Sequence, residues 1–155
     1  MQQYGNTNTT LVLDGHSRGA MTIGNALESL NTDPLMMQGV LGNTNINFYG
    51  PAYNAQNAAD LLYNLSEGKQ TQIMMENNVA DPVGRFVGNN NPTGGTVQSN
   101  TSILWEMFRA ATGQDGGTSH NSYGDAPKTG LDNFWGGVKP VPQPVIANPA
   151  KRVTP

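Results

Sequence analysis

A short apolar strand pattern that runs into a glycine-flanked turn and then into an amphipathic helix is the strongest constraint on the fold of this chain. Residues 9–13 (TTLVL) form a β-favouring run without polar alternation, which predicts a strand covered on both faces, as in a parallel sheet. Apolar residues recur at helical spacing from Ala20, and Asp33-Pro34 ends the pattern. The segment therefore predicts a strand, a tight turn and a helix. The apolar helical positions are Ala20, Ile23, Gly24, Leu27 and Leu30.

The same rhythm repeats further along the chain. Residues 45–49 and 70–75 predict two more strands, and a helix capped by Asn54 lies between them. Strands that alternate with helices favour right-handed crossovers and a parallel sheet, so the predicted fold class is α/β with helices flanking the sheet. Runs rich in Gly and Asn, such as residues 88–95, predict long surface loops. The apolar face of the second helix is Ala55, Ala58, Leu62 and Leu65.

The length of 155 residues predicts one domain, which we place at residues 1–138. Residues 103–111 predict a further amphipathic helix, and residues 119–124 lie in a second Gly-rich loop. Half of the chain's ten prolines lie from Lys139 onward, where few large apolar residues occur. Residues 139–155 therefore predict a Pro-rich extended tail or linker.

Composition excludes several classes of function. Charged residues make up 12% of the chain and the net charge is −3, so the sequence predicts no nucleic-acid partner. The absence of cysteine excludes a thiol nucleophile and disulfides, and two histidines without cysteine predict no metal site. The Gly-rich runs lack the Lys and Ser/Thr of a phosphate loop, so no cofactor is predicted. The sequence shows neither a long apolar span nor the pattern of a classical signal peptide.

The turn after the first strand matches G-x-S-x-G, the nucleophile elbow of α/β-hydrolases, with Ser17 as the candidate nucleophile. The glycines at positions 15 and 19 let neighbouring backbone pass without a Cβ clash. Ser17 would lie at a helix N-terminus, where the Arg18 N–H could stabilise an oxyanion. The alternative is a chance match, since short glycine-containing windows also arise by accident. The strand before the motif and the helix after it favour the elbow and an α/β-hydrolase-like sheet.

A serine hydroxyl needs a base to take its proton, and only His16 and His120 are available. His16 is adjacent to Ser17, so its ring would have to fold back on its own backbone. His120 lies far along the chain in a loop, as the fold would need, and it is the predicted base. The alternative is a loop histidine without a catalytic task.

The third member of such a triad is a carboxylate, and α/β-hydrolases carry it between the serine and the histidine. Asp81 follows the third predicted strand, at the sheet edge where active sites lie, and it is the first choice. Glu76, at the end of that strand, is the reserve. Asp60 in a helix and Glu67 in a helix-end turn are weaker candidates. Asp81-Pro82 could also be only a turn.

Three segments together resemble the C-terminal region of large bacterial exoproteins of the filamentous haemagglutinin type, some of which carry contact-dependent growth inhibition toxins. They are residues 14–19 (DGHSRG), 77–84 (NNVADPVG) and 119–124 (SHNSYG). The resemblance covers most of residues 9–125. It implies a secreted or cell-surface protein with lipase- or esterase-like activity used as an antibacterial effector. It also implies an immunity protein as partner, with Ser17, Asp81 and His120 as nucleophile, acid and base.

The chain departs from the usual hydrolase in having only eight residues before the strand that precedes the elbow. In that fold, a loop after an upstream strand supplies the second oxyanion donor, so an upstream half of the parent protein is the expected partner. The leading hypothesis is a serine hydrolase that cleaves carboxylic esters, including lipids, through an acyl-enzyme. The alternative is a non-catalytic hydrolase-like module of a secreted exoprotein. A nuclease effector that uses His120 is a third hypothesis, which the charge balance disfavours.

Overall fold

The fold is a four-stranded sheet with two helices on one face, seen in a computed structural model that describes residues 9–33, 39–93 and 141–151, together with Phe108, Thr112, His120 and Tyr123. The elements, in chain order, are β1 (Leu11–His16), α1 (Arg18–Thr32), β2 (Thr44–Tyr49), α2 (Ala55–Leu65), β3 (Gln72–Glu76), the π-helix η1 (Val83–Val87), β4 (Gln143–Ile146) and the 3₁₀ turn η3 (Pro149–Lys151).

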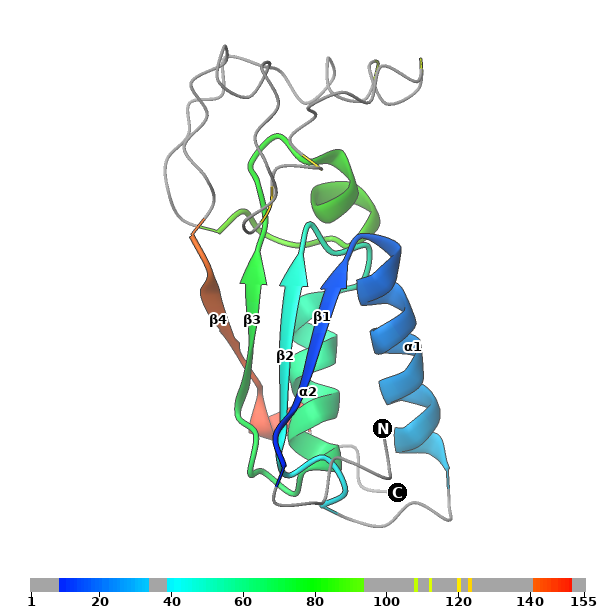
Figure 1. Cartoon of the computed structure of the whole chain (residues 1–155), viewed down its shortest axis with the longest axis vertical. Coiled ribbons are helices and arrows are strands. Elements are labelled where there is room, and N and C mark those ends of the chain that lie inside the picture. Colours follow the sequence, from blue (N-terminus) through cyan, green and yellow to red (C-terminus); the bar gives the residue numbers. More distant parts are fainter. Residues whose placement is uncertain are drawn as a thin grey trace.

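The sheet has the order β1-β2-β3-β4, with β1, β2 and β3 parallel (Figure 1). Each parallel pair is joined by one helix, as the alternating sequence pattern predicts. The strands begin and end one to three residues away from the prediction: β1 continues three residues further, through Asp14 and Gly15 to His16. The α/β class is therefore confirmed at the level of an open sheet with flanking helices.

β4 differs from the prediction, because it pairs antiparallel with β3 and makes the sheet mixed. Residues 143–146 are thus a strand of the sheet and not part of a free tail. Val145 lies opposite Ile73 and packs against the core, while Pro144, which has no N–H, occupies an edge strand where proline is tolerated. Asp60 anchors the segment, since its carboxylate accepts hydrogen bonds from the Asn148 N–H at 2.7 Å and from Gln56 at 2.9 Å.

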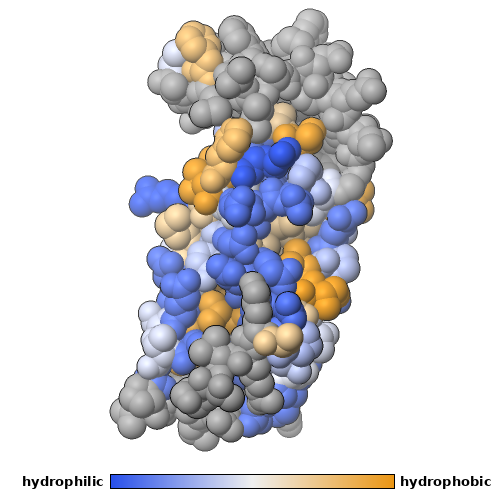
Figure 2. All heavy atoms as spheres, turned by 180° about the vertical axis from the view of Figure 1, so that it is seen from behind, coloured by the Kyte–Doolittle hydropathy of each residue, from blue (hydrophilic) through white to orange (hydrophobic). Residues whose placement is uncertain are grey.

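The core lies between the sheet and the helices. α1 packs against β1 and α2, and α2 packs against β3 and β4. Asn54 caps α2 as predicted, accepting a hydrogen bond from the Asn57 N–H at 3.0 Å. The outer face of the molecule on the helix side is largely hydrophilic, with separate apolar patches (Figure 2). The largest fully buried apolar side chains are Phe48, Leu27, Leu41, Ile46, Leu62 and Ile73.

The other face of the sheet is uncovered by any helix of the described part of the chain. Val12, Asp14 and His16 of β1 point to this face and are exposed, and Val12 retains 52% of its accessible surface. β1 also has β2 as its one strand partner among the described residues. The predicted helix at residues 103–111 lies almost wholly outside the described residues. Among the residues described, no helix has the length and apolar character needed to cross a membrane.

Candidate active site

Ser17 stands in a strained backbone conformation at the junction of β1 and α1. Its φ of 53° and ψ of −117° lie where residues other than glycine are rare, and such a conformation costs on the order of 1–3 kcal/mol. The end of β2 holds it there: the Ser17 N–H donates to the Tyr49 carbonyl at 3.1 Å, and the Ser17 carbonyl accepts from the Ala52 N–H at 3.2 Å. The sharp strand-to-helix turn that the sequence predicts is therefore present.

The two glycines of the motif, Gly15 and Gly19, differ in how closely other atoms approach them. A Cβ at Gly15 would lie 2.9 Å from the Ala20 backbone and from the Ile23 side chain, so only glycine lets α1 pass this close to β1. A Cβ at Gly19 would meet nothing within 4 Å in the described part of the chain. The expectation that both glycines relieve a backbone clash is thus correct for Gly15 and wrong for Gly19.

The N-terminus of α1 faces the site with free donors. The Ser17 side chain makes no capping hydrogen bond, and no acidic residue lies in the first turn. The first N–H groups of a helix have no intrahelical acceptor, and no described group accepts from the Arg18 N–H. Arg18 can therefore offer its N–H, at the positive end of the helix dipole, to an anion beside the Ser17 hydroxyl.

Asp81 is the fully buried carboxylate of this edge of the sheet, five residues after the end of β3. Its Oδ1 accepts from the Val83 N–H at 2.8 Å and the Gly84 N–H at 3.2 Å, the first turn of η1. Its Oδ2 lies 2.9 Å from His120 Nδ1 and accepts from the Tyr123 hydroxyl at 2.5 Å. Every oxygen of this buried group is therefore hydrogen-bonded.

Hydrogen bonding outweighs burial in setting the charge of Asp81. Burial alone raises the pKa of this carboxyl. The hydrogen bond and charge of His120, followed by the Tyr123 hydroxyl and the Gly84 N–H, lower it further than burial raises it. The net pKa lies below the ordinary value, so Asp81 is ionised at neutral pH.

His120 binds Asp81 through Nδ1, and its Nε2 makes no hydrogen bond within the described residues. An ionised carboxylate only accepts, so Nδ1 donates to it, and in the neutral ring Nε2 would carry the lone pair. The His120 ring lies beside the His16 ring, with the two centroids 4.7 Å apart, and His16 Nε2 is 2.7 Å from the His120 carbonyl oxygen. Within the described residues, no hydrogen bond joins His120 to the Ser17 hydroxyl.

The other carboxylates weighed from the sequence lie elsewhere or have other tasks. Asp60 is buried against β4, and Glu67 is exposed beyond α2. Glu76, at the end of β3, is buried near Tyr123 but makes no hydrogen bond to His120. Asp81 is therefore the carboxylate that contacts the predicted base.

Sequence reasoning missed one group that contacts this pair, Tyr123, which donates to Asp81. His16, an elbow residue of the predicted site that is not its predicted base, contacts His120 through its ring and its Nε2. No spacing rule marks Tyr123, although it lies three positions after His120 in the segment singled out from the sequence. Only the folded chain brings its hydroxyl beneath the carboxylate.

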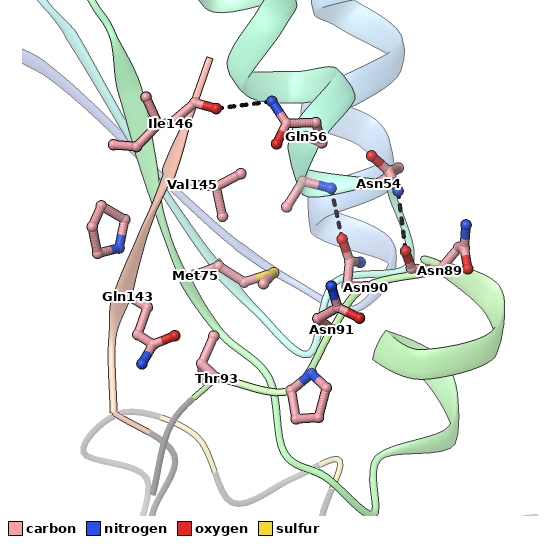
Figure 3. Close-up of a pocket in the computed structure, with 13 residues that line it drawn as sticks. Asn54, Gln56, Met75, Asn89, Asn90, Asn91, Thr93, Gln143, Val145 and Ile146 are labelled. Carbon is pink, nitrogen blue, oxygen red and sulfur yellow. Dashed lines mark hydrogen bonds between the residues drawn. The ribbon is translucent and has the colours of Figure 1, made fainter. Parts of the chain in front are cut away.

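A cavity of about 380 Å³ opens elsewhere, between α2, β4 and the loop at residues 89–93 (Figure 3). Its carboxamides are largely engaged within the protein: Asn90 accepts from the Ala55 N–H, Asn54 donates to the Asn89 carbonyl, and Gln56 donates to the Ile146 carbonyl. None of the predicted site residues lines it. These amides fasten the loop and β4 to the first turn of α2. In the described residues, no three His, Asp or Glu side chains lie close enough to hold a metal ion.

No protein-family model matches the chain, and comparison with curated proteins and with solved structures finds no match. Function is therefore inferred from the residues around Ser17, Asp81 and His120.

Replacement of the two motif glycines by alanine is expected to have opposite effects on stability. Gly15→Ala forces α1 away from β1 and lowers the free energy of unfolding by about 1–3 kcal/mol. Gly19→Ala, at an exposed helical position, raises it by up to about 1 kcal/mol because alanine favours the helix. Urea denaturation of both variants measures the two changes, and equal losses would contradict the packing described here.

The buried carboxylate is expected to make stability fall in acid. Because the folded pKa of Asp81 is below the ordinary value of 3.8, its contribution is complete above pH 3.8 and is lost as the pH falls through the folded pKa. Wild type should therefore be more stable than Asp81→Asn at pH 7, and the difference should shrink below pH 3.8. Urea denaturation from pH 7 to pH 2 measures this difference. A difference in free energy of unfolding that stays constant from pH 7 to pH 2 would contradict the lowered pKa of Asp81.

Proposed function

We propose that this chain is a serine hydrolase that cleaves carboxylic esters through an acyl-enzyme, with Ser17 as nucleophile, His120 as base and Asp81 as the acid that orients His120. The observation that carries the proposal is the buried, ionised Asp81 bound to His120 Nδ1, together with a serine in strained elbow geometry at the same edge of the sheet. The free Nε2 of His120 is the chemically competent base for a hydroxyl at this edge of the sheet.

In the proposed reaction, His120 Nε2 takes the proton of the Ser17 hydroxyl as its oxygen attacks the ester carbonyl. The Arg18 N–H stabilises the resulting oxyanion, and Asp81 stabilises the imidazolium. His120 then returns the proton to the leaving alcohol, which leaves an acyl group on Ser17. Water, deprotonated by His120, releases the carboxylic acid and restores the hydroxyl.

The setting of this activity is also a proposal. The three segments that resemble filamentous haemagglutinin-type exoproteins contribute His16, Asn78, Asp81, His120 and Tyr123 to one cluster, and Ser17 follows His16 directly in the chain. This convergence supports a shared functional site. The proposal extends to a secreted or cell-surface bacterial effector with lipase- or esterase-like activity and an immunity protein as partner.

A second oxyanion donor is expected from outside the described residues. Only the N-terminus of α1 offers a donor at the elbow in the part of the chain that the structure describes, whereas acyl-transfer sites generally use two. No described residue pairs with the outer edge of β1 or covers the sheet face beside it, which leaves room there for a further element. An upstream half of a longer parent protein is the proposed source.

A non-catalytic, hydrolase-like module is the second candidate function. The observation in its favour is that no hydrogen bond joins the Ser17 hydroxyl to His120 in the described residues. Free enzymes often have loose catalytic hydrogen bonds that tighten with substrate, so this gap does not decide between the two candidates.

Labelling by a fluorophosphonate probe distinguishes the two candidates. We expect the chain to form a covalent adduct at Ser17, and the adduct should disappear in Ser17→Ala because the nucleophilic oxygen is gone. Ser29→Ala is the matched control: its hydroxyl bonds only the Asn25 carbonyl on exposed α1, so labelling should persist. Intact-protein mass spectrometry measures the adduct. Labelling that survives in Ser17→Ala would overturn the assignment of Ser17 as the nucleophile. If the wild-type protein is not labelled, even with the upstream sequence present, the non-catalytic module is favoured.

The two histidines are expected to differ sharply in the same assay. His120→Gln should slow labelling by roughly 10²–10⁴-fold, as expected for loss of a general base. His16→Gln removes a neighbouring ring without removing the base, so labelling should slow by less than about tenfold, within the effect of one lost hydrogen bond. Labelling rates at neutral pH measure both effects. The reverse order would identify His16 as the base.

A further inference from the structure

The Tyr123 hydroxyl lies between two groups that fix the direction of its hydrogen bonds. It accepts from the Asn78 N–H at 2.9 Å, and it lies 2.5 Å from Asp81 Oδ2. A backbone N–H can only donate, so the phenolic proton must point to the carboxylate. The Tyr123 side chain is buried, with 6% of its surface exposed. Water therefore cannot easily replace this donor.

The space around this contact excludes a side chain at the end of β2. Gly50 has a φ of +48°, and a Cβ there would collide with the Asp81 carboxylate and the Tyr123 ring. The Gly50 N–H donates to the Glu76 carbonyl at 2.9 Å, which joins the turn after β2 to the end of β3. The carboxylate and the phenol thus meet in a site that three chain segments form together.

Tyr123 and the N-terminus of η1 hold opposite oxygens of Asp81. The η1 N–H groups bind Oδ1 and Tyr123 binds Oδ2, while His120 Nδ1 lies 3.0 Å from Oδ1 and 2.9 Å from Oδ2, so the carboxylate has one rotational setting in which all its donors are satisfied. The two residues lie three positions apart in sequence, so the Tyr123 contact also places the chain that carries His120. The hydroxyl remains a donor, since burial and the charge of Asp81 hold the pKa of Tyr123 well above its usual range.

We propose that Tyr123 is a positioning residue of the site: through its hydrogen bond to Oδ2 it holds the Asp81 carboxylate aimed at His120 Nδ1. The proposal deepens the hydrolase function and rests on it for its catalytic consequence. The hydrogen bond from the Tyr123 hydroxyl to Asp81 can be measured without any reaction. The titratable groups near Tyr123 are Asp81, His120, Glu76 and His16.

The test compares Tyr123→Phe with Tyr53→Phe. Tyr53 is a matched control, because it is also buried and donates to a carboxylate, that of Glu28 at 2.6 Å, away from the site. In Tyr123→Phe the midpoint for protonation of Asp81, followed by carboxyl ¹³C NMR, should rise by about one pH unit, since one hydrogen bond to the charged form is lost. Fluorophosphonate labelling at neutral pH should fall about tenfold, because a carboxylate that has lost this hydrogen bond holds His120 less firmly. Tyr53→Phe should change neither quantity.

A third variant separates positioning from folding. Replacement of Tyr123 by 3-fluorotyrosine preserves the shape of the ring and strengthens the donor, so the Asp81 midpoint should move below that of wild type. The proposal is overturned if the Asp81 midpoint is the same in Tyr123→Phe as in Tyr53→Phe. It is also overturned if 3-fluorotyrosine at position 123 leaves that midpoint unchanged. A third outcome is that the Asp81 titration shifts in Tyr123→Phe but the wild-type protein is not labelled. That outcome would support the proposed hydrogen bond from Tyr123 to Asp81 and overturn the hydrolase function.

Discussion

A buried carboxylate is the group on which the rest of the site depends. An ionised carboxylate without hydrogen-bond donors is strongly destabilising in a protein interior, so Asp81 persists only because the chain brings donors to both oxygens. The first turn of η1 supplies two of them, and His120 and Tyr123 supply the others. The segments that carry these donors must therefore meet at Asp81. The same contacts leave His120 with one free ring nitrogen directed away from the carboxylate.

The sheet supplies the platform for this cluster. Parallel strands end at a common edge, so Ser17 after β1, Gly50 after β2 and the Asp81 loop after β3 lie together. The strained backbone of Ser17 is sustained by hydrogen bonds to the end of β2 and the turn after it. Strain of this kind persists only where the surrounding structure overdetermines it, which makes the elbow and its neighbours one cooperative unit.

Local patterns predicted most of the scaffold. The helical spacing from Ala20, the Asn54 cap and the apolar runs of β1, β2 and β3 correspond to elements within three residues, because each depends on neighbours in sequence. β4 escaped prediction, since four residues that include Pro144 carry no strand signal of their own. Its place is set by Ile73 opposite Val145 and by the Asp60 anchor, which are contacts between distant segments.

The sequence by itself determined the strand, turn and helix around Ser17, the order of serine, acid and histidine, and the small set of residues that could act as base or acid. Only the tertiary structure decided that Asp81, and not Glu76, contacts His120, that Gly15 but not Gly19 is needed for packing, and that Tyr123 completes the carboxylate's hydrogen bonds. The reason is physical: backbone propensity and apolar spacing act over a few residues. The partners of a buried charge are instead chosen by whichever distant donors the folded chain brings within about 3 Å of it.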